Sequence, residues 1–259
     1  MNYAELFCQS HFSFLQGASS PQELVQQAAE LGYSALALTD ECSVAGVVRA
    51  YRHINEQQLA IKLIIGSYLR LDKLQLVLLC PDKQAYSELC RVITNARRRS
   101  SKGNYQLTEW DLMSIRHCLL LWLPDGDADS DAHWANWLQK YHTGRLWLAM
   151  RRELNHNEAA FHAYCQQLAQ QYQLPQMCCG AVLMHTPERL ALQHCLSAIK
   201  AGKPIAELGR HLLSNTERAL RSISKLQKLF AAAWLEQSCL IANRCSFSLD
   251  ELKYQYPSE

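Results

Sequence analysis

Two carboxylates and one histidine that could bind a metal ion follow short apolar segments of the sequence. Asp40 and Glu41 come directly after one such segment, and His185 follows another. Carboxylates and neutral imidazoles hold divalent metal ions, which lower the pKa of a bound water and neutralise phosphate oxygens. A zinc site built from His185, Asp40 and a thiol, Cys80 or Cys179, is one interpretation. The simpler interpretation, which we favour, is a loop histidine near buried thiols.

Arg97, Arg98 and Arg99 form the only run of three basic residues. They end the predicted helix 86–97, where positive charge interacts favourably with the helix dipole. The alternatives are contact with a DNA backbone or docking on an acidic surface of a partner. Because the net charge is only +2, the chain lacks a broad positive field. We therefore expect no measurable DNA binding through this run at physiological salt.

The composition predicts a folded chain with reduced thiols. Of 259 residues, 49% are apolar, which suffices for a sizeable core and excludes disorder. The 11 cysteines are odd in number and never spaced Cys-x-x-Cys, so neither a disulfide framework nor a cysteine zinc site is predicted. We expect free and mostly buried thiols, such as Cys80, Cys118 and Cys178, in a reducing cytosol. Cys42 has no local signature of a cysteine nucleophile.

Apolar strands alternate with amphipathic helices and must position these side chains. The pattern predicts strands at 6–9, 35–38, 61–66, 69–71, 74–79, 118–123, 146–150 and 176–183. It predicts helices at 20–31, 47–55, 86–97, 133–141, 157–172, 189–201, 223–229 and 231–244. Ser20, Pro21 and Glu23 are typical of a helix start with a capping box, and Gly32 suits the helix end. Asp72 begins a predicted turn between two strands.

Repeated strand–helix units indicate a parallel sheet or a barrel. Roughly seven strands in about 185 residues fit a small (β/α) barrel better than a dinucleotide-binding fold. Neither Gly-x-Gly-x-x-Gly nor Gly-x-x-x-x-Gly-Lys-Ser/Thr occurs, so both common nucleotide-binding loops are absent from the sequence. There is no signal-peptide pattern and no apolar segment long enough to span a membrane, so we expect a cytoplasmic protein with no membrane contact.

Three blocks of the sequence resemble the polymerase and histidinol phosphatase (PHP) family. They are residues 8–19 (CQSHFSFLQGAS), 35–46 (ALALTDECSVAG) and 64–67 (IIGS). With residues 96–99 and 244–252, the whole chain is similar to the N-terminal domain of bacterial error-prone C-family DNA polymerases of the ImuC type, relatives of the DNA polymerase III alpha subunit. The resemblance implies an α/β fold, a distorted seven-stranded (β/α) barrel of PHP type. We expect this barrel at 1–186 and, at 187–259, a helical extension and connector toward an absent polymerase palm.

Active members of this family hold up to three metal ions at the C-terminal ends of the strands, and here the resemblance implies a degenerate site. The seven ligand positions correspond to Phe7, Gln9, Asp40, Glu41, Tyr68, Ala181 and Leu183. Only Asp40 and Glu41 offer carboxylates, and adjacent residues at a strand end point in different directions. Such a pair makes at best a weak divalent-ion site. We expect no metal cofactor and no hydrolysis, with Asp40 capping the helix that follows.

The resemblance implies a non-catalytic structural domain of an error-prone polymerase that performs translesion synthesis during the SOS response. For that whole polymerase it implies, as partners, the polymerase domains of the same chain, accessory mutasome proteins, the sliding clamp and DNA. Two alternatives stay open. One is a residual metal-dependent phosphoesterase, acting as an exonuclease or pyrophosphatase. The other is a DNA-contacting module that acts through Arg97, Arg98 and Arg99.

Overall fold

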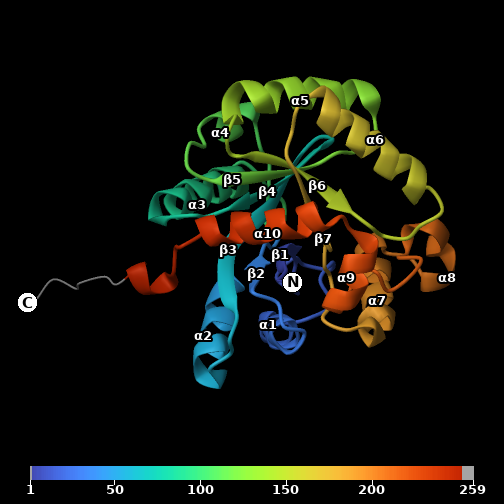
Figure 1. Ribbon diagram of the computed structural model, residues 1–259. Coiled ribbons are helices and arrows are strands. Elements are labelled where there is room, and N and C mark those ends of the chain that lie inside the picture. The colour runs from blue at the N-terminus through green and yellow to red at the C-terminus, as the bar shows by residue number, and fades with distance from the viewer. Residues whose placement is uncertain (1, 253–259) are drawn as a thin grey trace, which may run out of the picture.

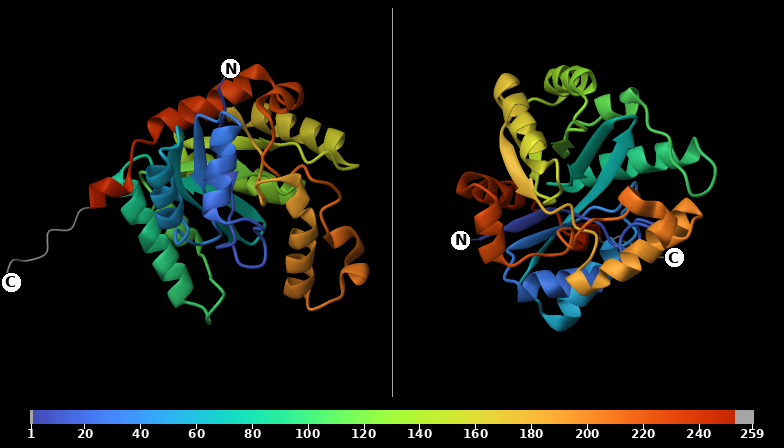
Figure 2. Two further views of the ribbon diagram at one scale, coloured as in Figure 1. Left: turned by 90° about the horizontal axis from the view of Figure 1, so that it is seen from below. Right: turned by 90° about the vertical axis from the view of Figure 1, so that its right-hand side faces the viewer.

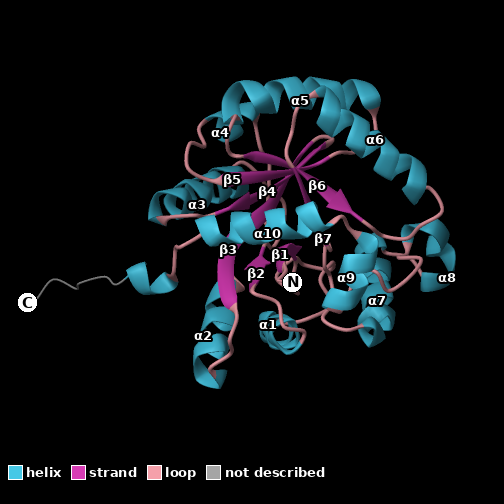
Figure 3. Cartoon of the chain, viewed as in Figure 1, coloured by secondary structure: helices cyan, strands magenta, loops and turns pink. Residues whose placement is uncertain are grey.

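Seven strands form one sheet in the order in which they occur along the chain. The computed structural model describes residues 2–252, and helices surround the strands on the outside (Figures 1 and 3). The strands are β1 (Ala4–Cys8), β2 (Ala35–Leu38), β3 (Lys62–Leu71), β4 (Leu74–Leu79), β5 (Leu119–Leu123), β6 (Leu146–Arg151) and β7 (Gln176–Cys179). The predicted α/β barrel is confirmed.

The α-helices occupy most of the connections between strands and much of the C-terminal part that the structure describes. They are α1 (Pro21–Glu30), α2 (Val47–Gln57), α3 (Lys83–Arg98), α4 (Glu109–Met113), α5 (Ala128–His142), α6 (Glu158–Gln171), α7 (Leu190–Ala201), α8 (Ile205–Leu208), α9 (Ile223–Leu229) and α10 (Ala232–Arg244). Short 3-10 helices are η1 (Pro187–Arg189), η2 (Gly209–His211) and η3 (Leu249–Leu252).

Strand directions follow from the connections. β1, β2 and β3 are parallel, β4 is antiparallel to both of its neighbours, and β5, β6 and β7 are parallel. The hairpin between β3 and β4 turns at Asp72, which adopts a left-handed φ of 52° that aspartate tolerates in turns. The predicted interruption of β3 is wrong, because Ser67 and Tyr68 pair in register with β4.

The barrel closes through a kink after β7, which ends four residues earlier than predicted. Ala181 has a left-handed φ of 49°, a conformation that interrupts a strand. Val182 then returns to β1. Its carbonyl accepts from the backbone N of Gln9 at 2.9 Å, and its own N donates to the carbonyl of Phe7 at 2.9 Å. These two bonds join the first and last strands.

Local signals explain most helix boundaries. The predicted capping box is present: Ser20 Oγ accepts from the backbone N of Glu23 at 3.2 Å, and the Glu23 carboxylate accepts from the backbone N of Ser20 at 2.8 Å. Gly32 follows the helix with φ of 76°. The sequence pattern does not predict α4 or the first residues of α5. Thr108 caps α4 and Asp127 caps α5, each through its side chain.

Helix α10 covers one end of the barrel. Ile241 and Ala242 pack in the same apolar cluster as the inward-facing side chains of β1, β2 and β7. The backbone N of Ala4 donates to Ser238 Oγ at 3.3 Å, and Lys62 Nζ donates to the carbonyl of Ala242 at 2.8 Å. Figure 2 (left) shows α10 at the end where the N-terminus lies, with α7 and α8 extending toward the opposite side.

Three further predictions concern the cysteines, a membrane-spanning helix and the division into domains. All eleven cysteines are free, and the predicted burial of Cys80, Cys118 and Cys178 is confirmed. In the described part of the chain, no helix combines the length and apolar composition that crossing a membrane requires. The division at residue 186 stays a prediction, and residues 253–259 of the predicted connector lie outside the described residues.

Candidate functional site

Aromatic and aliphatic side chains fill the end of the barrel where β1, β2, β3 and β7 reach their carboxyl ends. The rings of Phe7 and Tyr68 stack with centroids 5.0 Å apart, and Tyr68 OH donates to Gln75 Oε1 at 2.7 Å. Burial raises the pKa of Tyr68 to about 12, which keeps the phenol neutral. Ala181 packs in the same cluster, and Leu183 is also buried. With the amide of Gln9, five of the seven positions singled out in the sequence are thus held by groups without a metal-binding charge.

The buried carboxylate of Asp40 is fully engaged by the loop after β1. Oδ1 accepts from the backbone N of Ser10 at 2.7 Å and from Ser13 Oγ at 2.8 Å, while Oδ2 accepts from Ser10 Oγ at 2.8 Å. The expectation that Asp40 caps the next helix is wrong. That helix begins only at Val47, and its N-cap, Gly46, has no side-chain bond. Asp40 therefore fixes the loop after β1.

Glu41 and Gln9 also have protein partners. Glu41 Oε1 accepts from Tyr105 OH at 2.9 Å, and its other oxygen accepts from Gln16. Gln9 Nε2 donates to Ser13 Oγ at 3.2 Å. These side chains hold the loops against one another, so neither carboxylate of the adjacent pair 40–41 presents two free oxygens to an ion.

The arginine run lies at the end of α3, as predicted, but two of its three members bind the chain itself. Arg97 donates to the carbonyls of Glu41 and Cys42 at 3.3 and 3.2 Å and lies over the Tyr105 ring. Arg99 forms a two-pronged ion pair with Asp111, with Nη2 to Oδ1 at 2.9 Å. Of these three arginines, Arg98 is the one that is exposed and makes no such contact with the described residues 2–252.

His185 lies beside Ser19. The Nδ1 atom is 2.7 Å from Ser19 Oγ, and burial lowers the pKa of the imidazole. Cys80 and Cys179 are buried. Across residues 2–252 no three His, Cys, Asp or Glu side chains are grouped so that they could hold a metal ion. The side chains present in residues 2–252 therefore do not fit the metal centre that the resemblance implies for active members of the PHP family.

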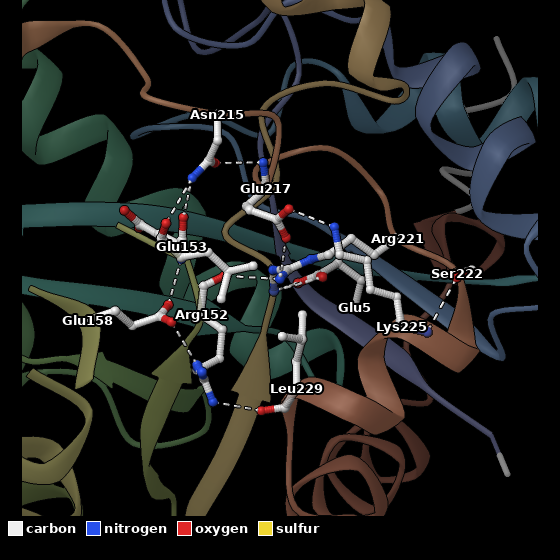
Figure 4. Close-up of polar contacts among 12 residues, drawn as sticks. Glu5, Arg152, Glu153, Glu158, Asn215, Glu217, Arg221, Ser222, Lys225 and Leu229 are labelled. Carbon is white, nitrogen blue, oxygen red and sulfur yellow. Dashed lines mark hydrogen bonds and ion pairs between the residues drawn. The ribbon is translucent and has the colours of Figure 1, made fainter. Parts of the chain in front are cut away.

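A buried carboxylate, which the sequence pattern does not single out, ties β1 to the segment after β7. Glu5 is 1% exposed and accepts from Tyr3 OH at 2.8 Å, from the backbone N of Phe7 at 3.0 Å and from the backbone N of Gly180 at 2.9 Å. Arg221 lies next to it (Figure 4). The only available signal was an acidic residue within the apolar segment that forms β1, which is rare unless the charge is paired.

The comparisons with known proteins agree with this fold. Residues 5–236 match the PHP domain family. The chain belongs to the PHP family. It is 57% identical to an error-prone DNA polymerase of Vibrio vulnificus (strain YJ016), 47% to one of Methylococcus capsulatus and 44% to one of Pseudomonas aeruginosa.

These alignments cover 99–100% of the PHP chain but 24–25% of the relatives, so the chain spans about a quarter of the length of the polymerases that it matches. Among solved structures, an amidohydrolase from Chromobacterium violaceum aligns with a TM-score of 0.48 and 11% identity, over 68% of this chain and 86% of that one.

Restoring two family histidines, Phe7→His with Leu183→His, is expected to destabilise the PHP chain. Both side chains are buried, at 3% and 4% exposure, and a buried polar group without a partner costs about 1–3 kcal/mol. The free energy of unfolding measured with urea should fall, and Phe14→His, at a side chain that is 78% exposed, should leave it nearly unchanged. Zinc-dependent stabilisation of the double variant would instead mean that this end of the barrel still accepts metal ligands.

Proposed function

We propose that this PHP chain is a non-catalytic structural domain at the N-terminus of an error-prone DNA polymerase. The observation that carries the proposal is the stacked pair of Phe7 and Tyr68, which occupies two of the positions where active family members place metal ligands. Because the neighbouring carboxylates already accept hydrogen bonds from serine, tyrosine and glutamine side chains, catalysis would need a rearrangement of several loops.

The parent protein, in this proposal, is a DNA-directed DNA polymerase, a nucleotidyltransferase that copies damaged templates during the SOS response in the cytoplasm. Support comes from the relatives, which are named error-prone DNA polymerases and are about four times as long as this chain. The partners of the domain are then the polymerase domains of the same chain. Accessory mutasome proteins, the sliding clamp and DNA are partners of the whole polymerase.

Elemental analysis of the purified chain tests the absence of catalysis. We expect less than stoichiometric zinc, manganese or iron, and no hydrolysis of a phosphodiester reporter above the blank when these metals are added. A different result would support the phosphoesterase alternative. The chain would then contain about one equivalent of metal and hydrolyse the reporter, and both properties would be lost in Asp40→Asn and in Glu41→Gln. Glu56→Gln, an exposed position on α2, is the matched control for loss of one carboxylate.

The structural role is tested with the rest of the polymerase. The partner in this test is a polymerase that lacks its N-terminal PHP domain and begins at the palm. We expect the 259-residue chain to form a complex with it that is detectable by sedimentation, and to raise its melting temperature. A truncated polymerase that is as stable and active alone as with the PHP chain would contradict the structural role.

A further inference from the structure

Two buried cysteines lie opposite each other on neighbouring strands, at the amino end of the barrel. Where β4 pairs with β5, Leu79 faces Leu119 at the end of the paired residues. The next step of this antiparallel register places Cys80 opposite Cys118. Cys80 is 1% exposed and Cys118 is fully buried. We call these two residues the cross-strand thiol pair.

Both thiols lie on the outer face of the sheet, beneath α3. The pair belongs to the apolar cluster that also contains the buried side chains of α3, whereas Leu79 and Leu119 pack in the cluster inside the barrel. Cys118 Sγ donates to the carbonyl of Ala85, in the first turn of α3, at 3.3 Å. Because successive side chains of a strand point to opposite faces, the two thiols point the same way.

The backbone hydrogen bonds of Cys80 determine how close the two side chains come. The backbone N of Cys80 donates to the carbonyl of Ile65 on β3 at 2.9 Å. Since its hydrogen-bonding groups face β3, Cys80 forms a non-hydrogen-bonded pair with Cys118 on its other side. In such pairs the Cα atoms are about 4.5 Å apart and the side chains are closest. A disulfide needs Cα atoms about 4.4–6.8 Å apart, so the backbone already meets this requirement.

Other thiols near Cys80 are less well placed to react with it. Burial is the main cause that raises the pKa of Cys80, followed by the thiols of Cys118, Cys245 and Cys90 in that order. Cys245 Sγ donates to the carbonyl of Ile241, one turn back on its own helix, at 3.5 Å. Cys90 lies on α3 and is only partly buried. The register and the order of these effects both select Cys118 as the partner.

We propose that a peroxide oxidises the cross-strand thiol pair to a disulfide that links β4 to β5. One thiolate attacks an oxygen of hydrogen peroxide, the O–O bond breaks, and a sulfenic acid and water are formed. The second thiolate attacks the sulfenic sulfur, the S–S bond forms, the S–O bond breaks, and hydroxide leaves as water. The two thiols thus lose two electrons and two protons, and hydrogen peroxide becomes two molecules of water.

The disulfide lies where the C-terminal segment meets the barrel. The carbonyl of Pro81, next to Cys80, accepts from the backbone N of Ser246 at 2.9 Å and from that of Phe247 at 3.1 Å. The bond therefore fastens the end of the strand that holds this segment. The dithiol is the form present in the structure, and a reducing compartment maintains it. The inference is independent of the proposed function and does not involve the opposite end of the barrel.

Peptide mapping without prior reduction tests the cross-strand thiol pair. Every protein in the test is the 259-residue chain with Cys195→Ser, because that exposed thiol can link two copies. Incubation with excess hydrogen peroxide lasts hours, since burial leaves little thiolate. The chain is then unfolded with iodoacetamide and digested with trypsin, which places the two cysteines on separate peptides, 74–83 and 117–140. We expect these peptides to be linked, with the loss of two alkylatable thiols and their recovery after dithiothreitol.

Two variants locate the bond. Cys118→Ser keeps a hydroxyl that can donate where the thiol does, and it should abolish the linked peptide. Cys178→Ser removes another buried thiol, whose register partner on β6 is Met150, and it should leave the linked peptide unchanged. Recovery of both peptides of the pair as alkylated or singly oxidised species would overturn the proposal. A bond from Cys80 chiefly to any thiol other than Cys118 would overturn it as well.

Discussion

Glu5→Ala is expected to lower the free energy of unfolding by about 1–3 kcal/mol or more, the cost of leaving buried hydrogen-bond donors without an acceptor. The carboxylate is buried on β1 and is the acceptor for three donors, Tyr3 OH and the backbone N–H groups of Phe7 and Gly180. Its removal would leave these three donors without their acceptor. Urea unfolding at neutral pH measures the loss.

The matched control for this substitution is Glu56→Ala. Glu56 pairs with Arg52 on the surface of α2, where both side chains are more than half exposed. Exposed pairs contribute little, so we expect a change within about 0.5 kcal/mol. Equal effects of the two substitutions would mean that the buried hydrogen bonds of Glu5 contribute no more than an exposed ion pair does. A milder loss in Glu5→Gln would show that acceptor geometry and charge both contribute.

The same residue shows where prediction from sequence succeeds and where it stops. Ser20 with Glu23, and Asp72 in the hairpin, act within four residues of themselves, so local pattern was enough to place a helix start and a turn. Glu5 is bound by Gly180, 175 residues away in the sequence, and no local pattern carries that information. The kink after β7 was missed for this reason: its cause is the closure of the barrel.

The residues of the candidate site also differ in how much of their role the sequence predicts. Phe7 could be recognised as unable to bind a metal from its chemistry alone. The partners of Asp40 could not be recognised from the sequence, because the two serines that bind it come from another loop. The prediction that Asp40 caps a helix is therefore wrong. The sequence predicts a helix end at the arginine run 97–99, but it does not show that Arg99 meets Asp111 across a loop.

Acidification is expected to destabilise the PHP chain through His142. This side chain at the end of α5 is fully buried, and burial, followed by the charges of Arg145 and Arg116, lowers its pKa from 6.5 to about 4. The folded state therefore binds this proton less readily than the unfolded state does. The stabilisation is fully present above the unfolded pKa and is lost as the pH falls from about 6.5 toward 4. A shift of this size corresponds to about 3 kcal/mol once the pH reaches the lower value.

Urea unfolding between about pH 7 and pH 5 isolates this contribution. The unaltered chain should lose about 2 kcal/mol more than His142→Asn over that interval, because the variant has no imidazole to protonate at that position. His133→Asn, at an exposed position on the same helix, should retain the full pH dependence. The variant at 142 starts from a lower stability, so the comparison is between slopes rather than absolute values. Parallel slopes for all three proteins would show that His142 titrates in the folded chain as it does in the unfolded one, which its burial against Trp137 and beside Arg145 argues against.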